Sequence, residues 1–327
     1  MIRNKKGMTI PELLVAMFMS LIVVSATYSF YIYFINNASK ERAKAEVQKK
    51  VNSVFSILSD DVRHSSFGLL KSSQKSVCLF VIDDNCSVGD DSFCKSGTDR
   101  FFVADGWQII RDFADDNCPD GNIADNVYEA IVGKEYAAKI NNYSPPDTID
   151  VNILDIDSKC RSNASLCGDG KCDDIKDNKA IIVCGCKDSN GASGNYWQEG
   201  RRIGSIDTTS KTITFLSKEK ALNYSYCSPD GRVLPANVWY IRKATDGVYW
   251  LYRNQRKVMD NVIDFQVEAG YDSNGDGMID NTEYKNILPN NINISDLKFL
   301  KFTMEVQYKW KDKIYKNSFS TTVETFH

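Results

Sequence analysis

Histidine is almost absent from this chain of 327 residues, which contains only His64 and His327. The sequence therefore has no obvious Ser-His-Asp or Cys-His arrangement, and its many carboxylates mark no recognisable catalytic pair. A charge of one sign is lacking as well, because 40 Lys and Arg residues nearly balance 43 Asp and Glu residues. Proteins that bind nucleic acid usually have a strongly basic surface. The composition therefore favours neither an enzyme nor a nucleic-acid partner.

Residues 12–67 lack both proline and glycine, the residues that most often interrupt a helix. The run over residues 8–35 is almost entirely apolar and is long enough to cross a membrane. Beyond Ile35, apolar residues recur at steps of three and four, as on one face of a helix: Ala43, Val47, Val51, Val54, Leu58 and Val62. We therefore predict one long helix over residues 8–68, with a transmembrane part at 8–35 and an amphipathic part at 36–68.

A short basic leader, residues 1–7, precedes the apolar run and contains Arg3, Lys5 and Lys6 but no acid. A secretory signal has an apolar stretch of about 7–15 residues, followed by its cleavage site. Here the candidate processing point, Gly7, comes before the apolar stretch, so cleavage between Gly7 and Met8 would leave the helix on the mature protein. Because basic residues hold a leader in the cytoplasm, we expect the chain beyond the helix to lie outside the inner membrane.

Glu12 is the single carboxylate within the apolar run. A carboxylate inside a bilayer costs about 2.5–3.5 kcal/mol on insertion scales, so such residues usually have a partner. Under one interpretation the helix is a plain signal anchor, and Glu12 stays hydrated near the interface. Under the other, cleavage makes Glu12 the fifth residue of the mature chain. It then pairs with the new α-amino group of Met8, in its own chain or in a neighbour.

Cysteine is absent from the first 77 residues, and all ten cysteines follow the helix: Cys78, Cys86, Cys94, Cys118, Cys160, Cys167, Cys172, Cys184, Cys186 and Cys227. An even number of cysteines in an oxidising compartment predicts disulfides. Neither the Cys167–Cys172 spacing nor the Cys184–Cys186 spacing matches the usual C-x₂-C pattern of a zinc site. All ten are therefore disulfide candidates, and the sequence leaves their pairing open.

The rest of the chain changes character near residue 200. Residues 69–200 form a cysteine-rich, elaborated region with only a few expected strands: Val77–Ile82, Phe101–Val103, Thr148–Leu154 and Ala180–Val183. Residues 201–327 contain clearer strands with short connections: Thr212–Phe215, Val238–Lys243, Gly247–Arg253, Val262–Ala269, Phe299–Tyr308 and Ile314–Val323. We predict an α+β fold in which an antiparallel β-sheet packs on the second half of the long helix, with residues 69–200 as a disulfide-rich inserted region.

Residues 272–283 match the twelve-residue calcium loop at every key position, with oxygen-bearing side chains at 1, 3, 5 and 9, Gly at 6 and Glu at 12. The predicted ligands are the side chains of Asp272, Asn274, Asp276 and Asp280, the carbonyl of Met278 and both oxygens of Glu283. Gly277 permits the sharp turn, and Ile279 is expected to anchor the loop to the core. A strand rather than a helix enters the loop, so the alternative is an acidic turn without a metal. We expect Ca²⁺ in a structural role.

The junction Lys5-Lys6-Gly7 followed by Met8-Thr9-Ile10-Pro11-Glu12-Leu13-Leu14-Val15 resembles the class III leader of type IV pilins and type II secretion pseudopilins. The resemblance implies a pilin-like fold and a prepilin peptidase that cuts after Gly7 and N-methylates Met8. Family members usually have Phe where this chain has Met8. It also implies that the helix passes from the inner membrane into the core of a filament.

Short segments of the C-terminal region are similar to PilW-type minor pilins: Val238–Ile241, Tyr249–Arg253, Asn261–Val267 and Phe319–Val323, with Asp61–Arg63 and Phe67-Gly68 at the end of the helix. The similarity covers residues 1–68 and 238–323. It implies a minor pilin that has its head in the periplasm before assembly and is then part of an extracellular pilus. The implied partners are other pilin and minor pilin subunits. The large head favours a tip or priming position.

Two alternatives remain open at this point. One is a type II secretion pseudopilin of the J type, which has the same plan but serves export. The other is a calcium-stabilised adhesin held by a plain, uncleaved signal anchor.

Overall fold

The computed structural model describes residues 9–65, 79–83, 86, 90–104, 138–144, 148–151, 180–186, 196–207, 212–219, 232–280, 282–286 and 297–325. The chain divides into two compact units. An N-terminal unit comprises Met1–Lys50 with Tyr308–Tyr315, and a head unit comprises Val51–Gln307 with Lys316–His327.

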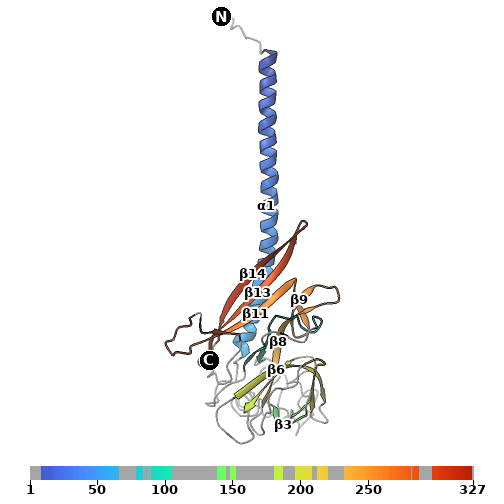
Figure 1. Ribbon diagram of the computed structural model, residues 1–327, viewed down its shortest axis with the longest axis vertical. Helices are drawn as coiled ribbons and strands as arrows, with labels where there is room; N and C mark the ends of the chain where they lie inside the picture. The colour runs from blue at the N-terminus through green and yellow to red at the C-terminus, as the bar shows by residue number, and fades with distance from the viewer. Residues whose placement is uncertain are drawn as a thin grey trace, which may run out of the picture. The chain divides into compact units, whose positions relative to one another are not determined.

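A single uninterrupted helix, α1 (Ile10–Ser65), begins the described chain (Figure 1). Its hydroxyl side chains within the apolar stretch donate to carbonyls three or four residues earlier, as Ser20 does to Met17 at 2.8 Å and Thr27 to Val23 at 2.8 Å. These bonds satisfy polar groups that an apolar environment would otherwise penalise. The helix is long and apolar enough to cross a membrane. The predicted long helix is thus present, with its ends within a few residues of the expected ones.

The last four turns of α1 belong to the head unit and pack on it with one face. Val51, Leu58 and Val62 are almost completely buried, as the stripe at three- and four-residue steps predicts. Asp61 fixes this part of the helix to the sheet behind it. It accepts bonds of 2.7 Å from both Nε and Nη2 of Arg253, and a bond of 2.8 Å from Nε1 of Trp239.

The larger sheet has ten strands in the described part of the chain: β1 (Phe80–Asp83), β2 (Arg100–Ala104), β3 (Ala138–Ser144), β4 (Thr148–Val151), β5 (Ala180–Cys186), β6 (Tyr196–Asp207), β7 (Thr212–Phe215), β8 (Arg232–Lys243), β9 (Tyr249–Arg253) and β10 (Arg256–Asp260). Each pair is antiparallel, and β8 is the central strand. Its residue Ala236 pairs with Ala104 on β2 and with Ala180 on β5, so these two strands lie on opposite edges of β8.

The smaller sheet has the order β12-β11-β13-β14, with β11 (Val262–Tyr271), β12 (Tyr284–Lys285), β13 (Leu297–Trp310) and β14 (Lys313–Glu324). In Figure 1 the three long strands run side by side. Buried and half-buried residues alternate along β13, as expected for a strand with one face on a core. Phe302 of β13 packs edge-on against Phe101 of β2, with ring centroids 5.2 Å apart, so aromatic side chains fill the space between the two sheets.

The expected strands are all present, but the sheet arrangement differs from the expectation. The sequence pattern predicts one antiparallel sheet, whereas the structure has two. Four strands were not expected, namely β3, β6, β10 and β12, and β6 runs through the expected boundary at residue 200. Gly200 in β6 lies against the ring of Phe102 in β2, where any Cβ atom would overlap the ring. Residues before and after 200 therefore build the same sheet.

Candidate functional sites

The predicted processing residues, Gly7 and Met8, lie outside the described residues, and the description begins at Thr9. Glu12 lies in the first turn of α1, where its Oε2 accepts bonds of 2.9 Å from both the backbone N–H and the hydroxyl of Thr9. Thr9 precedes the helix and Glu12 is its third residue, so the pair forms half of a capping box. No cation from the described residues accompanies the carboxylate. The T-x-x-E pattern in the sequence predicts this capping interaction. Our prediction for Glu12 considered only its charge and did not include the cap.

The apolar surface that follows Glu12 has no covering from the described chain. Large apolar side chains between Ile10 and Ile35 are 40 to 76 % exposed. They point in all directions around the helix rather than along one stripe. A helix that is apolar all round belongs in a membrane or among other helices. This part of α1 is therefore compatible with a membrane or with a bundle of helices around it.

The predicted calcium loop lies between β11 and β12 and is closed at both ends by backbone pairing. Gly270 pairs with Tyr284, and the N–H of Tyr271 donates to the carbonyl of Glu283 at 3.2 Å. A Cβ at Gly270 would lie 3.2 Å from Cγ2 of Ile279 and 3.0 Å from Tyr284, so Ile279 folds back over the end of β11. Ile279 is half-buried there, and its role as an anchor of the loop stays a prediction.

Backbone N–H groups of the loop are directed at its side-chain oxygens. The two oxygens of Asp272 accept from Gly275 at 2.6 Å and from Gly277 at 2.8 Å. Asn274 accepts from the N–H of Asp276, and Asp276 accepts from that of Met278, both at 2.8 Å. Gly275 and Gly277 have φ angles of +77° and +80°, which glycine adopts without strain. These bonds turn the first half of the loop around its own carboxylates.

Glu283, the twelfth residue, ties the two ends of the loop together. Its Oε1 accepts from the N–H and the hydroxyl of Ser273 at 2.9 and 2.8 Å, and its Oε2 accepts from the N–H of Asp280 at 3.1 Å. The bond from Asp280, with those from Ser273, lowers the pKa of Glu283. The hydroxyl and N–H of Thr282 likewise lower the pKa of Asp280. Both carboxyls are therefore held in the charged form that a cation requires.

The structure thus places the side chains of Asp272, Asn274, Asp276, Asp280 and Glu283 on one closed loop, but their oxygens bind N–H groups of that loop. Within the described part of the chain, no three Cys, His, Asp or Glu side chains gather closely enough to form a metal site. The predicted ligand at Met278 is its backbone carbonyl, and its side chain is 75 % exposed. A bound cation would have to draw the carboxylates inward.

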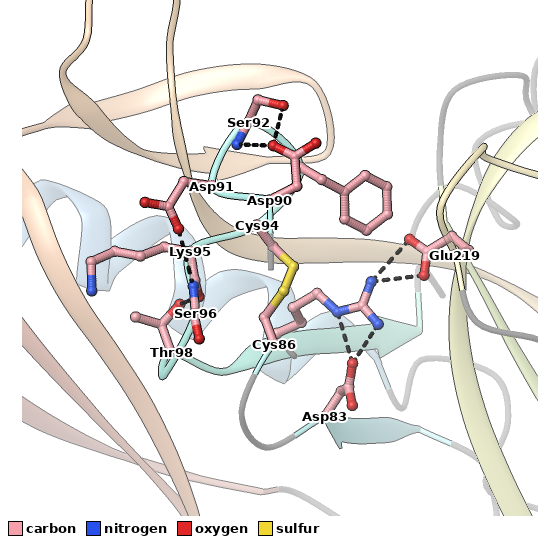
Figure 2. Close-up of a disulfide and its surroundings, with 12 residues drawn as sticks. Asp83, Cys86, Asp90, Asp91, Ser92, Cys94, Lys95, Ser96, Thr98 and Glu219 are labelled. Atoms are coloured by element: carbon pink, nitrogen blue, oxygen red, sulfur yellow. Dashed lines mark hydrogen bonds and ion pairs between the residues drawn. A yellow bond between two sulfur atoms is a disulfide. The ribbon is translucent and has the colours of Figure 1, made fainter. Parts of the chain in front are cut away.

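A disulfide joins two of the candidate cysteines, Cys86 and Cys94, a pairing that the sequence left open (Figure 2). Both cysteines are buried. Cys184 and Cys186 lie in β5, where only their backbone is described. The other candidates lie outside the described residues: Cys78, Cys118, Cys160, Cys167, Cys172 and Cys227.

Residues 90–99, which include Cys94 of this disulfide, bond to both sheets, and we call this segment the clasp. The N–H of Lys95 donates to the carbonyl of Ile241 in β8 at 2.8 Å. Asp99 binds β11, because its N–H donates to the carbonyl of Phe265 at 2.9 Å and its Oδ2 accepts from the N–H of Val267 at 2.7 Å. The clasp is thus a direct polar connection between the two sheets.

A buried charge cluster lies beside the clasp (Figure 2). Nη1 of Arg100 donates to both oxygens of Glu219 at 2.8 and 2.9 Å, and Nε donates to Asp83 at 2.7 Å. Arg202 adds a bond of 2.7 Å to Glu219. Burial alone would raise the pKa of Glu219, but the charges of Arg100 and Arg202 outweigh burial and lower the pKa. These paired charges connect β1, β2 and β6 with the turn that follows β7.

Sequence reasoning missed this cluster because its members are far apart in the chain and follow no short pattern. It also gave Asp61 no contacts, although the structure makes Asp61 the polar anchor of the helix. No known protein family, curated protein or solved structure matches this chain.

Proposed function

We propose that this chain is a membrane-inserted prepilin that is cut between Gly7 and Met8, N-methylated at Met8 and built into a type IV pilus as a minor subunit. The observation that supports this most strongly is the contrast within α1. Its last four turns are packed on the head, whereas the large apolar side chains between Ile10 and Ile35 are exposed on all sides of the helix. The proposed role is non-enzymatic, and the binding reaction is the packing of helices from different subunits.

Burial energetics support the proposed route from membrane to filament. Covering one large apolar side chain stabilises a protein by about 1.5–3 kcal/mol. The exposed stretch over residues 10–35 has many such side chains and therefore requires lipid or neighbouring helices over its whole circumference. A bilayer provides that cover before assembly, and a bundle of subunit helices provides it afterwards.

The test of this proposal is the N-terminus of the protein purified from cell envelopes of the organism that encodes it. Mass spectrometry of the terminal peptide is expected to find N-methylated Met8 as the first residue. Replacing Gly7 by Val, which blocks cleavage after a small residue, should leave Met1 in place and abolish incorporation into filaments. An intact Met1 on the unmodified chain would instead support an adhesin on a plain anchor and would refute the proposal.

Two further measurements separate the pilus from export and the tip from the shaft. Deletion of the coding sequence is expected to remove pili and leave secretion intact, whereas a J-type pseudopilin would show the opposite. Immunogold label on the head is expected at filament ends. Uniform labelling along the shaft would contradict a tip or priming position.

Within this proposal, Glu12 compensates the α-amino group of Met8 in a neighbouring subunit and sets the axial register. The bond to Thr9 offers a competing local role, and three variants distinguish the two. Glu12→Gln keeps an acceptor for the N–H of Thr9 but removes the charge, Glu12→Ala removes both, and Thr9→Ala removes only the hydroxyl donor. All three are expected to insert in the membrane.

If charge compensation sets the register, Glu12→Gln and Glu12→Ala both assemble poorly, and Thr9→Ala assembles normally. Filaments that incorporate Glu12→Gln as well as the parent chain would show that capping is sufficient and would end the charge proposal.

We also propose that residues 272–283 bind a structural Ca²⁺ ion. The complete twelve-residue pattern, the positive φ angles at Gly275 and Gly277 and the charged state of Asp280 and Glu283 support this. Extracellular calcium modules bind at about 10⁻⁴–10⁻³ M. Millimolar Ca²⁺ is therefore expected to raise the melting temperature of the full chain in detergent, and a chelator should reverse the shift.

The matched variants for the calcium test are Asp276→Ala and Asp312→Ala. The first removes a predicted ligand and should abolish the shift, whereas the second removes an exposed acid elsewhere and should preserve it. If neither Ca²⁺ nor the chelator changes the melting temperature, the loop is an acidic turn that binds no metal.

A further inference from the structure

The hairpin between β13 and β14 has a tip, Tyr308–Tyr315, that belongs to the N-terminal unit rather than to the head. The tip touches α1 immediately beyond the apolar stretch. Nε1 of Trp310 donates to the hydroxyl of Ser39 at 2.9 Å, and Nζ of Lys311 donates to Oδ1 of Asn36 at 2.7 Å. Nζ of Lys40 lies 4.6 Å from the ring centre of Tyr315. A segment near the C-terminus thus contacts α1 at the point where its apolar surface ends.

The side chains of the tip are those that favour a membrane–water interface. Tyr308 stacks on Tyr315 with ring centroids 5.6 Å apart, and Trp310 meets Tyr315 edge-on at 6.2 Å. Trp and Tyr are enriched where one end of a side chain is apolar and the other is wet. Ile314 is 65 % exposed on the same tip. An exposed apolar side chain at a turn is in contact with water, whereas at a membrane surface it can be buried against lipid acyl chains.

The charge of the tip is also suited to lipid headgroups. Lys309, Lys311 and Lys313 are exposed and face only one acid within the tip, Asp312. Each Lys or Arg close to an anionic bilayer contributes about a fivefold gain in binding. Exposed lysines next to Trp310 and Ile314 form a surface that matches anionic phospholipid in both charge and polarity.

The residues of α1 that hold the tip lie just beyond the apolar stretch, at the depth of a lipid headgroup layer. Asn36, Ser39 and Lys40 follow Ile35 by about 1.5 to 7.5 Å along the helix axis. The polar headgroup layer on each side of the hydrocarbon core is about 5–7 Å thick. Residues 10–35 extend over about 39 Å, which is more than the core of about 30 Å. When Ile35 lies at the boundary of the core, the residues that hold the tip lie within the headgroup layer. The aromatic residues Tyr28, Tyr31 and Tyr33 lie just below them on α1.

We propose that the hairpin tip Tyr308–Tyr315 is a membrane-interface anchor that binds anionic phospholipid headgroups beside the transmembrane helix. The inference rests on the membrane-inserted stage of the proposed function. It assigns to a remote part of the chain the role of holding α1 at a fixed depth in the bilayer until the subunit leaves for the filament.

The test uses the full chain reconstituted at low density in vesicles of phosphatidylcholine, with and without phosphatidylglycerol. One of the two lipids has bromine near the glycerol end of its acyl chains, which quenches nearby tryptophan. The parent chain is expected to lose part of its tryptophan emission, and more with brominated phosphatidylglycerol than with brominated phosphatidylcholine. Trp310→Phe should lose that quenching entirely. Trp250→Phe, a change in β9 of the head, should lower the total emission but keep the quenching.

The lysines are tested with the triple variant Lys309→Gln, Lys311→Gln and Lys313→Gln. It should keep the quenching of Trp310 but lose the preference for the anionic lipid, and high salt should do the same to the parent chain. Equal quenching in the parent and in Trp310→Phe overturns the inference. So does quenching that appears only at high protein density, because the tip then contacts another subunit. Failure of the chain to float with the vesicles would overturn the membrane stage of the proposed function as well.

Discussion

The two ends of α1 contain the same kinds of apolar residue, but these residues are exposed at one end and buried at the other. Between Ile10 and Ile35 these residues cover the whole circumference and stay exposed, whereas from Val51 to Ser65 they occupy one face and are buried on the head. The charged groups differ in the same way. Among the described residues, Glu12 bonds to Thr9 at the start of its own helix, whereas Asp61 bonds to two strands of the sheet. Among the described residues, one end of the helix is therefore covered by this chain, and the other end is not.

The largest expected effect is the loss of a buried leucine in the second half compared with an exposed one in the first. Leu58→Ala should destabilise the head by about 3 kcal/mol, because it leaves a cavity where the side chain is fully buried. Leu21→Ala should leave the unfolding midpoint of the head unchanged. Denaturant unfolding of the full chain in detergent, followed by near-UV circular dichroism, measures both. Equal effects of the two variants would remove the distinction between the helix halves.

Asp61→Asn should have the next largest effect, about 2 kcal/mol, since it weakens charged hydrogen bonds to Arg253 that are shielded from water. Asp60→Asn is the matched control, because Asp60 is the adjacent acid and is exposed. The same unfolding measurement applies. A loss at residue 60 as large as that at residue 61 would show that the charge of the helix end, rather than the bond to the sheet, stabilises the head.

The smallest effect concerns acid pH. The bonds of Asp90 to Lys218, and then to Ser92, lower its pKa to about 2. A lowered carboxyl pKa stabilises the fold above the unfolded value of about 3.9, and this contribution is lost as the pH falls from about 4 to 2. The head should therefore weaken in this range while the apolar half of α1 keeps its helical signal in detergent. Asp90→Asn should flatten this part of the pH profile, and an unchanged profile would exclude the assignment.

The sequence allowed α1 to be predicted almost to its ends because a helix depends on neighbours three and four residues away. Most strands were recognisable for a similar local reason, namely alternation and flanking turns. Strand β6 was not, because Glu199, Arg201 and Arg202 are charged residues that the fold buries by pairing them with other charges. The division into two sheets depends on pairings between distant strands, which no local pattern specifies.

The candidate sites also divide into local features, which a sequence pattern can predict, and contacts between distant residues, which it cannot. The calcium-type loop is contiguous in sequence, so its place between two strands could be predicted, whereas the bonds of Glu283 to Ser273 and Asp280 were not. The capping of α1 by Thr9 and Glu12 is local as well and could have been read from the T-x-x-E pattern. The contact of the hairpin tip with Ser39 joins residues 271 positions apart, and only the structure brings them together.

The clasp gives the Cys86–Cys94 bridge an influence far beyond its own short ring. A bridge between cysteines eight positions apart closes with little entropic cost and restricts the shape of the clasp, which contains one of the two cysteines. Asp91, Lys95 and Asp99 then meet β8, β9 and β11 as one prepared surface. Reducing this one bond would leave every ladder of both sheets intact and would loosen the joint between them, so that the head would come apart first along the seam between its sheets.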